Sequence, residues 1–460
     1  MLFNSVDFLI FFIIVFSVNY ALRKTLKPRV LFLLLCSYFF YASWNNYLLL
    51  LILASTLIDY FAALQIEKAE TPIHKKAFLY VSIILNLGVL GFFKYFNFFI
   101  ESAHTFFSSI GIPFHGATLE ILLPVGISFY TFQSLSYSVD VYRKTISAEK
   151  SFSKFALYIS FFPQLVAGPI VRSQDFFPWL KNVYRLSKKE FILGTSLIWF
   201  GLFKKILLAD FLALYSDKYF ENISASTHTI VDLVLGTLCF SMQIYLDFSG
   251  YTDVALGAAL LLGFTFPMNF NYPYLAKTFS EFWQRWHISL SYWFRDYVYI
   301  PLGGNRTNKT SRNVMITMLL SGLWHGAAWN FILWGAFHGV LLTFQKQLLS
   351  FSKHVLAQRI FVLICIIIGW YIFRIKQLSD MGYSLAHLQN FNIISIELGQ
   401  VLALIIVLLL FIYQLKSKTL NLKQKVLNLP IPMIIFVHAS IFLLITILGD
   451  YGKPFIYFQF

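Results

Sequence analysis

The stretch LSGLWHGAAWNFILWG, residues 320–335, carries a single ionisable side chain, the imidazole of His325, in mostly apolar surroundings. Similar apolar runs recur along the whole 460-residue chain. Many of them reach about 18 residues, enough for a helix to cross a hydrocarbon core of roughly 30 Å. Only 12% of the residues are charged and 58% are hydrophobic. The sequence therefore predicts an all-α polytopic membrane protein with about eleven to thirteen transmembrane helices.

No long polar region separates these runs, so we expect one integral membrane domain over residues 1–460. Within it, residues 1–142 are predicted to be plain scaffold helices and residues 151–348 to be the catalytic core. Residues 359–460 are predicted to be carboxyl-terminal helices followed by an extracytoplasmic tail. The core stands out because prolines, glycines and charged aromatic segments interrupt its apolar runs.

Two segments of this core do not fit a straight transmembrane helix. Pro163, Gly168 and Pro169 interrupt SFFPQLVAGPIVR, residues 160–172, which predicts either a re-entrant hairpin or an interfacial loop. The segment EFWQRWHISLSYWFRDYVYIPLGGNR, residues 281–306, is too charged to span the bilayer and too aromatic to lie free in water. It predicts short helices at the membrane surface.

Basic residues orient the helices. Lys or Arg occur in the loops at 23–29, 67–76 and 143–154, whereas the loops at 45–46 and 101–118 carry none. The positive-inside rule then makes the amino terminus extracytoplasmic, and counting onward makes the carboxyl terminus extracytoplasmic too. Positive charges follow the first apolar run, the reverse of a cleavable signal, so we expect a retained helix in the inner membrane. The formal charge of +15 is spread over many loops, which indicates contact with membrane lipids and argues against nucleic acid as a partner.

His325 is the strongest candidate for chemistry. If a helix begins near Arg312, His325 lies roughly 20 Å along it, inside the hydrocarbon core. Desolvation disfavours the imidazolium, and a neutral ring can take a proton from a hydroxyl, so His325 is a predicted general base. The alternative is a structural histidine bonded between helices. His338 lies about 220° further round the same helix, so it helps His325 only if the backbone breaks between them, at Asn330 or a glycine, and otherwise serves packing.

Other kinds of site lack support. The cysteines Cys36, Cys239 and Cys365 are isolated, and no P-loop, dinucleotide-binding GxGxxG, HExxH or GxSxG occurs in its required context. We expect no metal and no tightly bound cofactor. The segment around residues 277–312 is basic, and its cations either contact lipid headgroups or clamp the phosphates of a soluble cofactor. The residues concerned are Arg285, Arg306, Lys309 and Arg312.

Four long motifs carry a resemblance: FFPQLVAGPIVR (161–172), DFSGYTDVALGAALLLGF (247–264), FWQRWHISLSYWFRDYVYIPLGGNR (282–306) and SGLWHGAAWNFILWGAFHG (321–339). Together they resemble the membrane-bound O-acyltransferase superfamily, above all its bacterial branch that O-acetylates exported polysaccharides, including alginate and peptidoglycan. The resemblance covers almost the whole chain and implies many helices around a central tunnel.

The resemblance also implies roles for residues. The histidine of the WHG motif, His325, is the catalytic residue, and the second active-site position maps onto His287, where more distant relatives carry asparagine. Supporting residues in the same motifs are Arg295, Asp296, Trp324, Asn330 and His338. In FIYFQF, residues 455–460, Tyr457 matches a terminal tyrosine that collects the acetyl group and hands it to a separate periplasmic or extracytoplasmic SGNH/esterase-like O-acetyltransferase. Without the resemblance, Tyr457 would be an interfacial aromatic anchor.

We therefore expect an inner-membrane O-acetyltransferase that uses cytoplasmic acetyl-coenzyme A (acetyl-CoA) as acyl-donor substrate. Only the acetyl group crosses, and His325 either activates a hydroxyl or carries the acetyl covalently. The expected acceptor is peptidoglycan, because Phe-, Ile- and Lys-rich usage hints at an AT-rich genome unlike those of alginate producers. An alginate-like polysaccharide or teichoic acid D-alanylation is the related alternative. A transporter or flippase of a lipid-linked glycan, which needs no acyl donor, is the alternative from another class.

Overall fold

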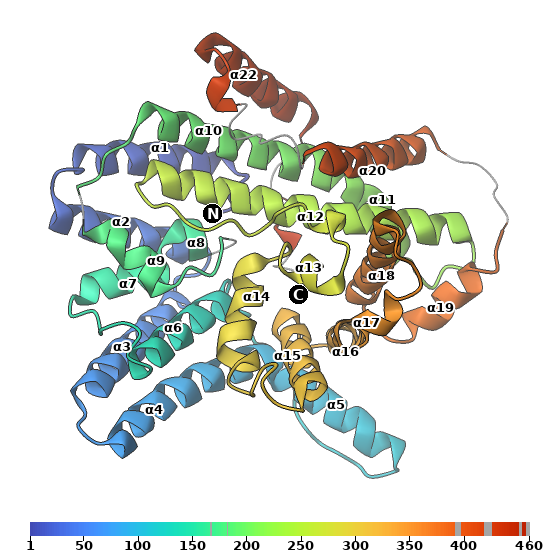
Figure 1. Cartoon of the computed structure of the whole chain (residues 1–460), viewed down its shortest axis with the longest axis horizontal. Coiled ribbons are helices and arrows are strands. Elements are labelled where there is room, and N and C mark those ends of the chain that lie inside the picture. Colours follow the sequence, from blue (N-terminus) through green and yellow to red (C-terminus); the bar gives the residue numbers. More distant parts are fainter. Residues whose placement is uncertain (166–167, 182, 392–396, 418–425, 450–452, 457–460) are drawn as a thin grey trace. The chain divides into compact units, whose positions relative to one another are not determined.

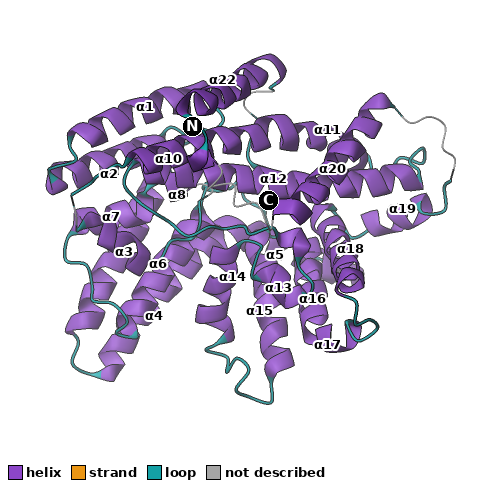
Figure 2. Ribbon diagram, turned by 45° about the horizontal axis from the view of Figure 1, so that its top comes forward, coloured by secondary structure: helices purple, strands orange, loops and turns teal. Residues whose placement is uncertain are grey.

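The computed structural model describes residues 1–165, 168–181, 183–391, 397–417, 426–449 and 453–456. Within these ranges the chain forms helices and loops and no β-strand (Figure 2). This confirms the predicted all-α class. The chain divides into two compact units, one made of residues 1–187 and 258–267 and the other of residues 188–257 and 268–460. The proposed division into scaffold, core and carboxyl-terminal parts stays a prediction.

The first unit consists of apolar helices joined mostly by short loops (Figure 1). The first helix starts where the Ser5 hydroxyl accepts a hydrogen bond from the Phe8 N–H, as an N-cap does. The helices are α1 (Val6–Ala21), α2 (Leu26–Ala42), α3 (Leu49–Lys68), α4 (Pro72–Leu90), η1 (Gly91–Tyr95), α5 (Phe96–Ser109), α6 (Ile127–Tyr142), α7 (Phe152–Ser160), α8 (Phe162–Leu165), α9 (Ser173–Phe176) and η2 (Phe177–Leu180).

The proline-containing segment of this unit is broken, as its sequence predicts. Helix α7 ends at Ser160, and α8 is a single short turn, Phe162–Leu165, whose residues are all buried. The Gln164 side-chain amide donates to the Tyr158 carbonyl at 2.7 Å. Protein therefore covers the interrupted backbone and supplies hydrogen bonds to it, which is the condition under which such a break is tolerated.

The second unit contains the predicted catalytic motifs. Its helices up to the first of those motifs are α10 (Lys188–Leu202), η3 (Phe203–Ala209), α11 (Asp210–Phe220) and α12 (Ile230–Leu261, which continues into the first unit). Next come η4 (Pro273–Leu275), α13 (Phe279–Trp283), α14 (Ile288–Phe294), η5 (Arg295–Tyr299), α15 (Thr310–His325), α16 (Trp329–Thr343) and α17 (Gln345–Leu348). The last are α18 (Val355–Arg374), α19 (Asp380–His387), α20 (Leu398–Ser417) and α22 (Ile431–Leu448). Between α12 and α15 every helix is short, so residues 281–306 form no span, as expected.

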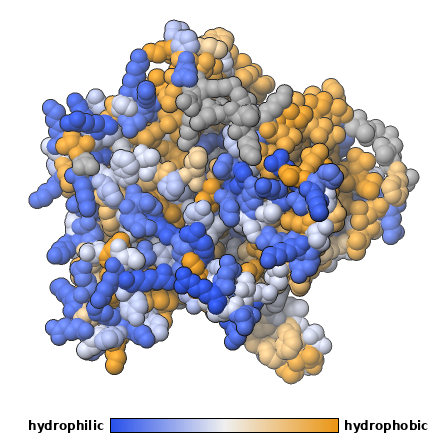
Figure 3. Space-filling model, in the orientation of Figure 1, coloured by the Kyte–Doolittle hydropathy of each residue, from blue (hydrophilic) through white to orange (hydrophobic). Residues whose placement is uncertain are grey.

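Six stretches of the described residues are long and apolar enough to cross a membrane. They are Leu49–Lys68, Pro72–Ser109, Ile230–Leu261, Val355–Arg374, Leu398–Leu415 and Ile431–Leu448. Among the shorter described helices, α1 (Val6–Ala21) is also apolar, and the expected number of eleven to thirteen spans stays a prediction. Apolar side chains lie at the surface along α20, where Leu408 and Leu409 are exposed (Figure 3). Such faces suit contact with lipid, and the protein is a multi-pass membrane protein.

Candidate active site

The helix is interrupted between the two histidines of the SGLWHGAAWNFILWGAFHG motif. Helix α15 ends at His325, and α16 begins at Trp329. Gly326 and Ala328, which lie between them, both have extended backbone. His325 and His338 therefore lie on different helices, which is the arrangement that lets them share a site. The glycine, rather than Asn330, marks the break.

Helices α15 and α16 pack so closely that only glycine fits at two contact points. A Cβ at Gly322 would lie 2.1 Å from the Phe331 carbonyl oxygen, and one at Gly335 would lie 2.4 Å from that of Met318. Small residues of this kind let membrane helices approach closely. The buried Asn330 side chain donates to the Phe373 carbonyl at 3.0 Å and so joins the start of α16 to the end of α18.

Aromatic rings surround His325, which is 4% exposed. The Trp324 and Trp334 rings each have their centroid 5.0 Å from that of the imidazole, and Phe373 lies at 5.3 Å. All three contacts are edge-to-face, the geometry that aromatic pairs prefer. The ring of His325 is therefore fixed in orientation in a water-poor environment.

The same tryptophans connect His325 to the other predicted histidines. Trp324 also contacts His287, at 5.9 Å between centroids, and Trp334 also contacts His338, at 4.8 Å. The second unit thus brings His287, His325 and His338 into one aromatic cluster. Within the described part of the chain, no group of three or more His, Cys, Asp or Glu side chains is placed to hold a metal ion.

His287 is held in a strained conformation. Its φ of 42° lies in the left-handed region, which costs a non-glycine residue on the order of 1–3 kcal/mol and recurs at functional sites. Asn269 holds this residue and the start of α14: its Oδ1 lies 3.3 Å from His287 Nδ1 and accepts from the Ser289 N–H at 3.1 Å. Because Asn269 Oδ1 can only accept, Nδ1 carries the proton of the neutral ring and Nε2 is the basic nitrogen. Burial lowers the pKa of His287 to about 3, so the ring is neutral near pH 7.

Asn269 was not predicted from the sequence, and neither was a buried ion cluster next to the carboxyl-terminal segment. Lys205 Nζ lies 2.7 Å from Asp210 Oδ1 and 3.0 Å from Asp247 Oδ1, and all three residues are buried. Lys205 also donates to the Pro454 carbonyl at 3.2 Å, and Asp247 accepts from the Ile456 N–H at 2.7 Å. We call Lys205, Asp210 and Asp247 the tail clamp. Charged side chains within apolar helices are the feature of the sequence from which this cluster could have been predicted.

The clamped segment also packs against the histidine cluster. Phe455 is fully buried, with its ring 4.6 Å from Tyr251 and 5.4 Å from Phe248. Phe248 in turn contacts His287, at 4.7 Å between centroids. A continuous run of ring contacts therefore leads from Phe455 through Phe248 to His287. Tyr457, the predicted acetyl carrier, lies outside the described residues.

The predicted basic residues occupy two kinds of position. Arg285 is paired with Glu281 at 2.7 Å. Burial alone would raise the pKa of the Glu281 carboxyl, but the Lys277 N–H and the Arg285 guanidinium outweigh it and hold that pKa below its usual value. Arg295 and Asp296 form an ion pair at 2.7 Å in which the arginine is half exposed. The remaining three cations, Arg306, Lys309 and Arg312, are exposed.

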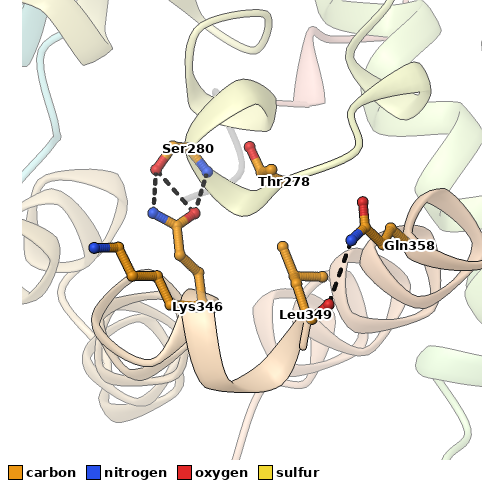
Figure 4. A pocket seen from close by; sticks show the side chains of 6 residues that line it. Thr278, Ser280, Lys346, Leu349 and Gln358 are labelled. Atoms are coloured by element: carbon orange, nitrogen blue, oxygen red, sulfur yellow. Dashed lines mark hydrogen bonds between the residues drawn. The ribbon is translucent and has the colours of Figure 1, made fainter. Parts of the chain in front are cut away.

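A pocket of about 440 Å³ lies elsewhere in this unit, between α13, α17 and α18 (Figure 4). Ser280 and Gln345 join across it, with the Gln345 amide donating to Ser280 Oγ at 2.8 Å. The other lining residues are Thr278, Lys346, Leu349 and Gln358. None of the three clustered histidines lines it, so this pocket is separate from the predicted catalytic residues.

Comparisons with known proteins agree with these motifs. The profile of MBOAT, the membrane-bound O-acyltransferase family, matches residues 37–385. A probable alginate O-acetylase of Azotobacter vinelandii is 42% identical over 387 residues, 82% of this chain and 76% of that protein. A peptidoglycan O-acetyltransferase of Helicobacter pylori is 34% identical over 439 residues, 85% of this chain and 82% of that protein. A teichoic acid D-alanyltransferase of Bacillus subtilis is 30% identical over 234 residues, 48% of this chain and 58% of that protein. The chain therefore belongs to the membrane-bound O-acyltransferase family.

Proposed function

We propose that this acyltransferase takes acetyl from cytoplasmic acetyl-CoA and passes it outward across the inner membrane for O-acetylation of a cell-envelope polysaccharide. The names of the relatives support a polymer acceptor: alginate, peptidoglycan or teichoic acid. Identity is higher with the alginate acetylase than with the peptidoglycan enzyme, at 42% against 34%, so both polymers belong in the acceptor assay beside the expected peptidoglycan. A transporter has no support, because the family is one of acyltransferases.

The reaction needs a base at the acceptor hydroxyl and a path for one proton. In this scheme His325 takes the hydroxyl proton while the oxygen attacks the thioester carbonyl, and the C–S bond breaks as the new C–O bond forms. The imidazolium then returns the proton to the coenzyme A thiolate, which leaves as a thiol. His287, a neutral ring whose Nε2 can accept a hydrogen bond because Nδ1 faces Asn269 Oδ1, is the second histidine of this cluster and would position the acceptor hydroxyl.

The observation that carries this proposal is the run of contacts joining the carboxyl-terminal segment to His325. Phe455 contacts Phe248, Phe248 contacts His287, and Trp324 contacts both His287 and His325. Tyr457 follows the clamped Ile456 in sequence, and we propose that its hydroxyl is the first acetyl acceptor. A separate extracytoplasmic transferase of the SGNH/esterase type then takes the acetyl to the polymer. Both chain ends are extracytoplasmic in this scheme.

The donor side needs cations for its phosphates. Exposed Arg306, Lys309 and Arg312 follow α14 and η5 in the same unit as the histidines and suit phosphate contacts. Arg285 is already paired with Glu281, so we assign it a positioning role near Asn271, whose carbonyl accepts from Arg285 at 3.0 Å.

The test is acetyl transfer from labelled acetyl-CoA by purified protein carrying His325→Ala. We expect a fall of about 100- to 10,000-fold in turnover, the usual contribution of a general base, with an unchanged thermal melting profile. His354→Ala, which removes an exposed histidine of the same unit, is the matched control and should retain full turnover. Unreduced turnover in a folded His325→Ala protein would remove this imidazole from the mechanism.

A further inference from the structure

The first unit contains a carboxylate in the middle of an apolar helix. Asp59 lies in α3 and is completely buried. Helix α3 packs against α4 and α6, and α4 packs against α6, so Asp59 faces a three-helix junction. The expectation of plain hydrophobic scaffold helices misses this residue. An ionisable group at such a position is costly and therefore marks a candidate site.

Hydroxyl and amide groups from the neighbouring helices surround this carboxylate. The Ser82 hydroxyl donates to Oδ1 and the Ser134 hydroxyl to Oδ2. The Asn86 amide donates to both oxygens, at 3.0 and 2.9 Å, and Ser138 Oγ lies 3.4 Å from Oδ1. All four partners are buried. Hydrogen bonds donated by all four groups would stabilise the ionised carboxylate against the cost of burying it.

The charge of Asp59 has no cationic partner among the residues that the structure describes. Every partner that it has there is neutral. The second unit behaves differently, since Asp210 and Asp247 share Lys205. A buried charge is normally paired or binds a cation, because hydrogen bonds from neutral groups do not cancel its net charge.

We propose that Asp59 is the anionic ligand of a buried sodium site. Oxygen atoms suit a hard cation, and each serine hydroxyl can rotate to offer a lone pair to an ion while the carboxylate binds it directly. Asn86 now turns its NH2 group to Asp59 while its amide oxygen accepts from Ser55 at 2.8 Å, so the amide has to turn over for that oxygen to bind the ion. A single carboxylate matches a single positive charge, whereas calcium sites commonly gather several carboxylates. The close packing around the fully buried Asp59 favours the small sodium ion over potassium.

Sodium binding would tie α3, α4 and α6 together and stabilise the first unit. The test is thermal melting of the purified protein in NaCl, KCl and choline chloride at equal ionic strength and fixed pH. We expect NaCl, but neither KCl nor choline chloride, to raise the melting temperature by at least about 3 °C at saturation. Asp59→Asn should abolish this rise, and Asp175→Asn, which alters an exposed carboxylate of the same unit, should keep it.

Two results would overturn the sodium site. An equal rise in all three salts is an ionic-strength effect, and a melting temperature that follows pH but no alkali ion identifies a proton site or a purely structural carboxylate. If Asp59→Asn does not fold, Ser138→Ala keeps the charge and removes one ligand, and it should raise the sodium concentration at half-effect about tenfold. An unchanged half-effect concentration would count against the site. None of these measurements depends on acetyl transfer, so they succeed or fail separately from the proposed function.

Discussion

Phe455→Ala tests whether the carboxyl-terminal segment must be docked for acetyl transfer. The Phe455 ring is 0% exposed and lies against Tyr251 and Phe248. Truncating a buried phenylalanine to alanine typically costs about 3–5 kcal/mol. The segment follows the last described helix, α22, so we expect the loss to undock the segment rather than unfold the unit. Two hydrogen bonds between side chains and the backbone of the segment, from Lys205 Nζ to the Pro454 carbonyl and from the Ile456 N–H to Asp247 Oδ2, remain available in the variant.

A loss of about 3 kcal/mol lowers the ratio of docked to undocked segment on the order of 100-fold, since about 1.4 kcal/mol is a factor of ten. If docking is the state that transfers acetyl, transfer to the acceptor falls by up to the same factor. Release of free thiol from acetyl-CoA, measured in parallel, should fall by the same factor, because the C–S bond breaks only as the acceptor hydroxyl attacks.

The assay follows labelled acetyl into the acceptor and thiol release in the same sample. Phe442→Ala is the matched control, because it removes the same side chain from a position on α22 that is 53% exposed, and we expect it to have no effect. Acceptor labelling in Phe455→Ala as fast as in the unaltered protein and the control would refute the role of the docked segment.

Three further predictions concern single features of the second unit. Tyr457→Phe keeps the ring and deletes the hydroxyl, so acetylation of the polymer should be lost. Normal acetylation in this variant would mean that Tyr457 serves only as an interfacial aromatic anchor. Gly322→Ala would place a Cβ 2.1 Å from a carbonyl oxygen of α16 and should cost roughly 1–3 kcal/mol in a thermal melt, whereas Gly88→Ala, which meets nothing within 4 Å, should not. Charge reversal at Arg306 and Lys309 should raise the acetyl-CoA concentration for half-maximal rate at least tenfold. If that concentration is unchanged, the two residues contact lipid headgroups rather than the donor's phosphates.

The fold class could be predicted because bilayer thickness fixes the length of an apolar helix, and the apolar runs show that length directly. The break between α15 and α16 was harder to place. Glycines occur at positions 322, 326, 335 and 339, and only Gly326 lies at the break. Gly322 and Gly335 instead serve close packing between the helices. The sequence shows where the glycines are, but whether a side chain would fit at each of them depends on the neighbouring helix.

Part of the candidate site could also be predicted from the sequence. His287, His325 and His338 stand out in aromatic surroundings, and the structure brings them together through Trp324 and Trp334. The tail clamp was not predicted, because Lys205 and Pro454 are 249 positions apart and no periodicity links them. Asn269 was missed because an asparagine in a loop is common, and its role depends on the left-handed backbone at His287.

Buried charges in the two units lead to different conclusions although their sequence signal is the same. Asp59, Asp210 and Asp247 are each an acidic residue in an apolar stretch. In the second unit Asp210 and Asp247 both pair with one cation, Lys205, which also holds the carboxyl-terminal segment through the Pro454 carbonyl, so each carboxylate there has a cationic partner. In the first unit hydroxyls and one amide satisfy the oxygens of Asp59 but leave its net charge. Hydrogen bonds and charge compensation are separate requirements, and a carboxylate that meets only the first is the one for which a bound cation has to be sought.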